Sequence, residues 1–133
     1  MKKFTVVIIL ALAAFISCKK TDTGLYEPGV IGSWHLISFG SILLPQTPAD
    51  SIVTTFQLSG KYISTSNATV TEKGSYKVTE QKNSSAGDEQ IINFSPETGS
   101  DHQAYLYLSN DTLRLTHIVI STDGVFSLYK RQD

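Results

Sequence analysis

The chain has 133 residues, of which 41% are hydrophobic and 17% are charged. Its 11 lysines and arginines face 12 acidic residues, which gives a net charge of −1 with the histidines neutral. This balance lacks the basic surface by which proteins bind nucleic acid, so we expect no nucleic-acid partner. A single cysteine excludes a disulfide within the chain.

The first residues follow the pattern of a secretory signal peptide. Lys2 and Lys3 precede a run over residues 4–16 that is apolar at every position but one, and a polar segment begins at Lys19. A charged start, a short apolar middle and a small residue before the cut are typical of such a peptide. The run is shorter than the ~20 apolar residues that span a bilayer. We therefore predict that residues 1–17 are a signal peptide.

The single cysteine comes directly after this segment. Phe15-Ile16-Ser17-Cys18 resembles the lipobox of bacterial lipoproteins, in which the cysteine carries a diacylglycerol and its new amine usually carries a further acyl chain such as palmitate. The resemblance implies a membrane anchor at Cys18, and two or more acyl chains make such an anchor stable. Lys19 is not the aspartate typical of inner-membrane retention, so the resemblance points to the outer membrane and leaves the leaflet open. A free thiol is the alternative.

Residues 18–30 are predicted to form a flexible tether. They are polar, and Gly24, Pro28 and Gly29 disfavour regular structure. A coil of about a dozen residues has its ends roughly 20 Å apart, which would hold the domain close to the membrane. The remaining residues 31–133 are enough for one domain with one core.

The sequence after residue 31 alternates with the period of β-strands. Short runs rich in Val, Ile, Thr, Tyr and Phe are separated by turn residues. Short strands joined by short loops form an antiparallel meander, and closure into a barrel removes its open edges. We predict an all-β fold, an eight-stranded antiparallel up-and-down barrel. Its strands are expected at roughly residues 31–39, 51–58, 61–66, 74–80, 89–95, 103–109, 112–120 and 125–131.

A short motif opens the first predicted strand. Gly32-Ser33-Trp34 stands at its start, and Arg131 stands at the end of the last strand. This arrangement resembles the G-x-W motif of lipocalin and calycin barrels, in the form found in small bacterial lipoproteins. In that family the tryptophan plugs one end of the barrel and the arginine packs across it. The resemblance implies a lipocalin-like barrel in which Gly32, Trp34 and Arg131 have structural roles.

Two places are candidates for contact with a ligand. The longest predicted loop, residues 40–50, carries Ile42, Leu43 and Leu44 in succession. The resemblance makes this loop a lid at the barrel mouth, where the three residues would contact a ligand or partner; the alternative is that they cap the core. His117 interrupts the apolar face of its predicted strand, either as a ligand contact or as an interior histidine with satisfied hydrogen bonds.

The sequence contains no recognised catalytic or metal-binding motif. It has no G-x-S-x-G, no H-E-x-x-H and no glycine-rich phosphate loop. His35, His102 and His117 are not spaced as metal ligands. We therefore expect no enzymatic activity, no catalytic residue, no cofactor and no metal.

Two functions remain open at this point. The first is a lipid-anchored envelope protein whose barrel binds a small apolar or amphipathic molecule. The second is a filled barrel that acts as a protein-interaction or inhibitor module in the envelope. Apolar residues out of phase with the predicted core, such as Ile37 and Ile118, favour the second function. The sequence identifies neither the ligand nor a protein partner.

Overall fold

The computed structural model describes residues 29–83, 87–118 and 124–133. The predicted signal peptide, Cys18 and most of the predicted tether lie outside these ranges. Within them every regular element is a β-strand, and no helix is long and apolar enough to cross a membrane. The strands are β1 (Gly32–Ser41), β2 (Leu44–Gln46), β3 (Ile52–Phe56), β4 (Lys61–Ser66), β5 (Thr69–Asn83), β6 (Gly87–Pro96), β7 (His102–Ser109), β8 (Thr112–His117) and β9 (Val125–Arg131).

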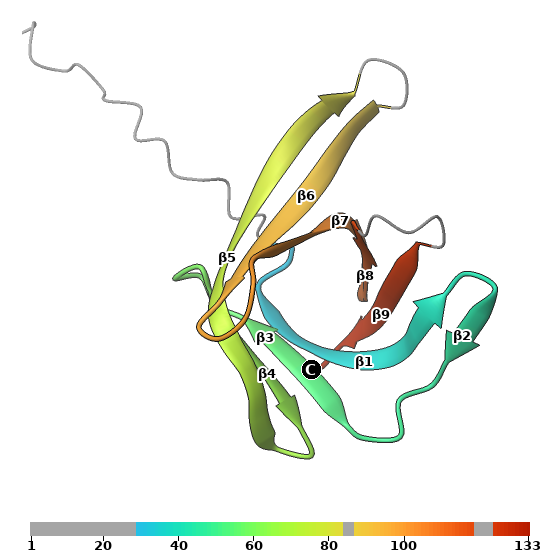
Figure 1. Cartoon of the computed structure of the whole chain (residues 1–133), viewed down its shortest axis with the longest axis vertical. Helices are drawn as coiled ribbons and strands as arrows, with labels where there is room; N and C mark the ends of the chain where they lie inside the picture. The colour runs from blue at the N-terminus through green and yellow to red at the C-terminus, as the bar shows by residue number, and fades with distance from the viewer. Residues whose placement is uncertain (1–28, 84–86, 119–123) are drawn as a thin grey trace, which may run out of the picture.

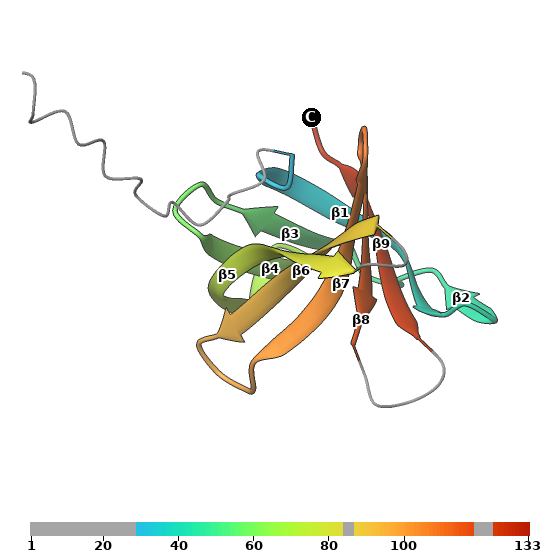
Figure 2. The same ribbon diagram turned by 90° about the horizontal axis from the view of Figure 1, so that it is seen from above.

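The strands form a closed antiparallel barrel. From β3 to β9 each strand pairs with the next in the sequence, and β1 pairs with both β3 and β9, which closes the sheet. In the closing pair Trp34 lies opposite Arg131, and Gly40 lies opposite Phe126. Figures 1 and 2 show these strands curving around a common space. The predicted eight-stranded up-and-down barrel is therefore confirmed, formed by β1 and β3 to β9.

Three details of the strands differ from the prediction. The short strand β2 lies in the segment expected to be a loop and pairs with the end of β1, so the β1–β2 hairpin projects from the barrel (Figure 1). β5 begins at Thr69 rather than 74, because its first half pairs with β4 and its second half with β6. This extension brings Glu72 into the barrel wall. β8 ends at His117 and Ile118 is not part of a strand, while the predicted end at 120 lies outside the described residues.

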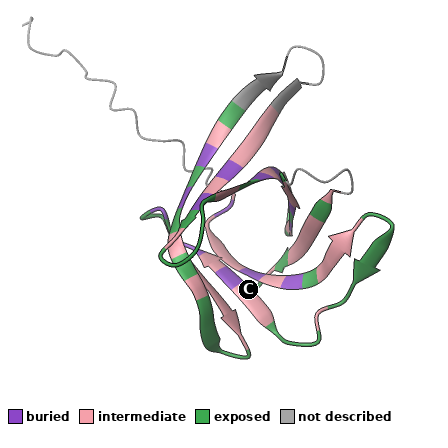
Figure 3. Ribbon diagram, in the orientation of Figure 1, coloured by how far each residue is buried: buried purple, intermediate pink, exposed green. Residues whose placement is uncertain are grey.

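The core lies inside the barrel, where alternate residues of each strand point inward. Aromatic rings form its centre: the ring centroids of Phe56 and Tyr76 are 5.0 Å apart, and those of Tyr62 and Phe94 are 5.1 Å apart, both edge-to-face. Figure 3 shows buried positions on the barrel strands and exposed positions on the β1–β2 hairpin. The other buried members of this cluster are Val30, Trp34, Val78, Ile92, Ala104, Leu106, Leu113 and Leu115.

At one end of the barrel, which we call the Trp34 end, residues of the first and last strands contact each other. Trp34 is fully buried, and the guanidinium carbon of Arg131 lies 4.2 Å from its ring centroid. The indole N–H donates a hydrogen bond to the carbonyl of Val30 at 2.8 Å. Arg131 donates two further hydrogen bonds, to the carbonyls of Ile31 and Gly29. The last strand is therefore tied both to β1 and to the residues just before it.

Gly32 fits this end for two reasons. Its φ is +129°, a conformation that side chains with a Cβ rarely adopt. A Cβ at this position would also lie 2.9 Å from Nη1 of Arg131. Glycine therefore leaves the space that the arginine needs.

The packed part of the chain begins before the predicted start of the domain at residue 31. Val30 is fully buried and belongs to the core cluster, although it falls in the predicted tether. Its carbonyl accepts the indole hydrogen bond, and the carbonyl of Gly29 accepts one from Arg131. These two residues are therefore part of the domain.

Removing either partner of the Trp34–Arg131 contact should destabilise the barrel. Trp34→Ala should lower the free energy of unfolding by about 3–5 kcal/mol, because a large core side chain is lost. Arg131→Ala should lower it by about 2–4 kcal/mol, since the cation–π contact and two hydrogen bonds from a charged group are lost. Urea unfolding of both single variants and of the double variant should give losses that are less than additive.

Arg131→Lys is the matched control for this experiment. It keeps the positive charge but lacks the planar fork that reaches two carbonyls at once, so it should recover only part of the loss. Fully additive losses for Trp34→Ala and Arg131→Ala would contradict an energetic contact between the two side chains.

Candidate functional site

The barrel contains a cavity of about 190 Å³, which we call the chamber. It reaches toward the end of the barrel opposite to Trp34, where β7 begins and β8 ends, which we call the His117 end. Its walls come from seven strands, β3 to β9. The lining residues are Thr54, Phe56, Tyr62, Ser64, Glu72, Phe94, His102, Leu115, His117 and Tyr129.

Part of this lining is apolar. Phe56, Phe94 and Leu115 are buried core residues, and the centroids of the two phenyl rings lie 6.1 Å apart. The Tyr62 ring packs against both, with its centroid 6.3 Å from that of Phe56. The chamber therefore offers an aromatic surface on which the apolar part of a small molecule could rest.

The lining also carries a carboxylate, that of Glu72. Glu72 lines the chamber because it lies on the same face of β5 as the buried residues Tyr76 and Val78. The Tyr62 hydroxyl donates a hydrogen bond to Oε1 of Glu72 at 2.7 Å. Burial raises the pKa of Tyr62 well above its ordinary value, and the hydrogen bond and the charge of Glu72 raise it further. The tyrosine therefore keeps its proton at neutral pH and remains a donor.

Further hydroxyl groups surround this carboxylate. The Thr54 and Ser64 hydroxyls are 2.8 Å apart and form a hydrogen bond across β3 and β4. Burial raises the pKa of Tyr129, although hydrogen bonds to Ser127 and Thr54 oppose this shift. These groups can donate or accept hydrogen bonds, so they suit a ligand with a polar group.

Two histidines complete the His117 end. The His102 ring stacks on Phe94 with centroids 4.9 Å apart, and its centroid lies 6.2 Å from that of His117. Burial lowers the pKa of His117, the nearby His102 lowers it further, and the charge of Glu72 opposes both. The His117 ring is therefore neutral at pH 7, and its Nε2 lies 3.4 Å from the Ser127 hydroxyl.

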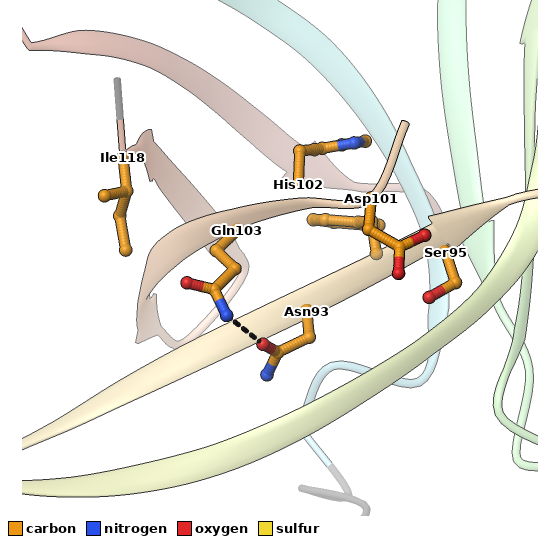
Figure 4. Close-up of a pocket in the computed structure, with 7 residues that line it drawn as sticks. Asn93, Ser95, Asp101, His102, Gln103 and Ile118 are labelled. Atoms are coloured by element: carbon orange, nitrogen blue, oxygen red, sulfur yellow. Dashed lines mark hydrogen bonds between the residues drawn. The ribbon is translucent and has the colours of Figure 1, made fainter. Parts of the chain in front are cut away.

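A larger hollow of about 380 Å³ lies beside β6 and β7 (Figure 4). Its two amide side chains bind each other, because Gln103 Nε2 donates to Asn93 Oδ1 at 2.6 Å. The Asn93 amide also donates to Lys77 O and Thr79 Oγ1, each at 3.3 Å. The amide of Asn93 therefore already has partners on β5 and β7. Its lining residues are Asn93, Phe94, Ser95, Asp101, His102, Gln103 and Ile118.

The structure separates the two candidate sites of the sequence analysis. His117 lines the chamber. Ile42 and Leu43 form the turn of the β1–β2 hairpin, and the exposed fractions of Ile42, Leu43 and Leu44 are 67%, 83% and 72%. The interpretation that these three residues cap the core is therefore wrong. They are also absent from the chamber lining.

Of the polar residues that line the chamber, the sequence analysis singled out only His117, and it missed Thr54, Tyr62, Ser64, Glu72, His102 and Tyr129 as site residues. Glu72 shares the inward face of β5 with Tyr76 and Val78, but the strand was expected to begin two residues after it. Tyr129 lies two residues before Arg131 on the same inward face of β9. His102 joins the site only through the pairing of β6 with β7, which sets it opposite Phe94. Alternation along a longer β5 would have indicated Glu72, and alternation along the predicted strand 125–131 already places Tyr129 on the same face as Arg131.

Neither a search for metal-binding groups nor comparison with known proteins assigns a role to this site. Among the described residues, no group of three or more His, Cys, Asp or Glu side chains is arranged to hold a metal ion. No family model matches the chain, and a search of the curated proteins finds no match. The resemblance to lipocalin-like lipoproteins therefore stays a prediction.

The position of His117 should make stability depend on pH. The pKa of His117 in the folded protein lies below the unfolded value of about 6.5, so the unfolded chain takes up this proton first as the pH falls. The free energy of unfolding should therefore decrease as the pH falls from about 7 to about 5. His117→Gln cannot take up this proton and should flatten the decrease. Urea unfolding across this pH range measures both curves, and equal slopes would contradict a role for His117.

Proposed function

We propose that the protein is a lipid-anchored lipocalin-like protein of the cell envelope, held in the outer membrane through Cys18, whose chamber binds one small amphipathic molecule. The observation that carries the binding role is the chamber itself, a cavity of about 190 Å³ lined by both aromatic rings and polar groups. A filled barrel would leave no such space.

The size of the chamber limits its ligand. Its volume equals that of roughly six molecules of liquid water, and typical sites for drug-sized ligands occupy about 300–1,000 Å³. The ligand would therefore be a small molecule rather than a long acyl chain. Its apolar part would lie on Phe56 and Phe94, and its polar part would face Glu72 and the histidines.

The anchor rests on the sequence alone. Residues 15–18 have the lipobox pattern, and Lys2 and Lys3 begin a typical signal peptide. Acyl chains contribute about 0.8 kcal/mol per buried methylene, so two or three chains would hold the domain at a membrane surface.

The anchor is tested by metabolic labelling. The protein expressed in a Gram-negative host should incorporate labelled fatty acid and fractionate with membranes. Cys18→Ser should abolish both, because a hydroxyl cannot form the thioether that links the diacylglycerol. Label that persists in Cys18→Ser would overturn the proposed anchor.

Binding in the chamber is tested by native mass spectrometry of the full chain purified from its envelope. We expect a discrete small-molecule adduct on the wild-type protein. Ser64→Leu should remove it, because the larger side chain would fill the chamber from β4. Ser75→Leu is the matched control: Ser75 is exposed, so the adduct should survive. No adduct on the wild type, or an equal adduct on Ser64→Leu, would contradict binding in the chamber.

A protein-interaction role is the second candidate, and the exposed tip of the β1–β2 hairpin is the observation that favours it. Three consecutive apolar side chains more than 60% exposed are costly to leave in water. Contact with another envelope protein would cover them. The absence of a small-molecule adduct in the experiment above would make this role the better one.

A further inference from the structure

Glu72 is a carboxylate in the chamber lining, and among the described residues no lysine or arginine forms an ion pair with it. Within the described ranges the ion pairs are Lys73–Glu97 and Lys130–Asp111, and both are exposed. The guanidinium of Arg131 contacts Trp34 and two carbonyls at the Trp34 end.

The other titratable groups that line the chamber with Glu72 come from four strands. Tyr62 on β4 donates a hydrogen bond to Oε1, and burial keeps this hydroxyl and that of Tyr129 on β9 protonated. His117 on β8 has a lowered pKa, and His102 on β7 stacks on Phe94. The lining therefore contains one acidic group and no lysine or arginine.

The carboxylate has capacity for a further donor. An ionised carboxylate has about four lone-pair positions on its two oxygens, and the Tyr62 hydroxyl occupies one of them on Oε1. A hydrogen bond from a charged donor to a carboxylate is about twice as strong as one between neutral groups. A ligand ammonium could therefore bind Glu72 more strongly than a ligand hydroxyl could.

The aromatic walls favour the same charge. The rings of Phe56, Tyr62 and Phe94 lie within 6.3 Å of one another and line the chamber together. The faces of such rings attract cations electrostatically, by about 0.5–2 kcal/mol according to the degree of desolvation. Carboxylate and rings thus surround one small space with negative potential.

The geometry points to a small organic cation as the ligand, with a protonated amine bound to Glu72 and an apolar body against Phe56 and Phe94. This inference rests on the proposed binding function and specifies the chemistry of that same chamber. The negative charge of Glu72 supplies the selectivity over neutral and anionic molecules of equal size.

Three matched probes test this inference: benzylamine, benzyl alcohol and benzoate. They share one ring and differ in charge. Each is titrated into the full-length chain and followed by calorimetry and by methyl NMR signals of Ala104 and Leu115, which are buried inside the barrel. We expect benzylamine to bind at least tenfold more tightly than benzyl alcohol, and benzoate to bind most weakly.

Glu72→Gln is the decisive variant. It keeps an oxygen that can accept the Tyr62 hydroxyl, and it removes the negative charge. We expect the affinity for benzylamine to fall at least tenfold and that for benzyl alcohol to change less than twofold. Glu80→Gln is the matched control, because Glu80 is an exposed residue on the same strand, and it should bind benzylamine as the wild type does.

The outcomes separate this inference from the proposed function. Equal binding of benzyl alcohol or benzoate, or unchanged benzylamine binding by Glu72→Gln, would overturn the preference for a cation while leaving the chamber a binding site. Failure of all three probes to bind at millimolar concentrations would also overturn it. In that case the mass-spectrometric adduct decides whether the chamber binds another molecule.

Discussion

The barrel depends on the pairing of its last strand with its first. Without β1–β9 pairing, the eight strands would be an open meander with two unpaired edges, which invite association with other chains. The residues that close it lie 100 positions apart, so the contact must offset the entropy of a long loop. Arg131 contributes three stabilising contacts to this closure. It lies opposite Trp34 in the β1–β9 pairing, its guanidinium covers the Trp34 ring, and it donates hydrogen bonds to carbonyls before β1.

The two ends of the barrel differ in the side chains that occupy the interior. At the Trp34 end, apolar side chains fill the interior and the arginine seals it. At the His117 end, polar side chains replace them, and burial of polar groups is costly unless each finds a partner. Pairs such as Tyr62–Glu72 and Thr54–Ser64 satisfy part of this requirement. Apolar side chains carry no such cost when they are buried, so the polar residues at this end are not explained by packing alone.

The sequence was sufficient for the architecture, because alternation and turn residues act locally along the chain. Its eight barrel strands appear near their predicted positions, and Trp34 contacts Arg131 as the motif implied.

The chamber was harder to predict, because its residues are brought together by the register between strands. Glu72 was missed because β5 begins before the predicted residue 74. Its first half pairs with β4 and its second half with β6, and the sequence of β5 alone does not indicate that it pairs with two strands. The exposed β1–β2 hairpin was missed for a similar reason, because Leu44 pairs with Ser41 in a strand of only three residues.

The chamber exists because of side-chain size rather than strand number. An eight-stranded barrel is just wide enough for its interior to be filled by side chains, as it is around Trp34 and Leu113. A cavity at the other end must therefore come from small residues at inward positions. Thr54 and Ser64 are such residues, and they lie on neighbouring strands across from the histidines. These two hydroxyls bind each other, and Glu72 remains as the charged group that a ligand in the space beside them would meet.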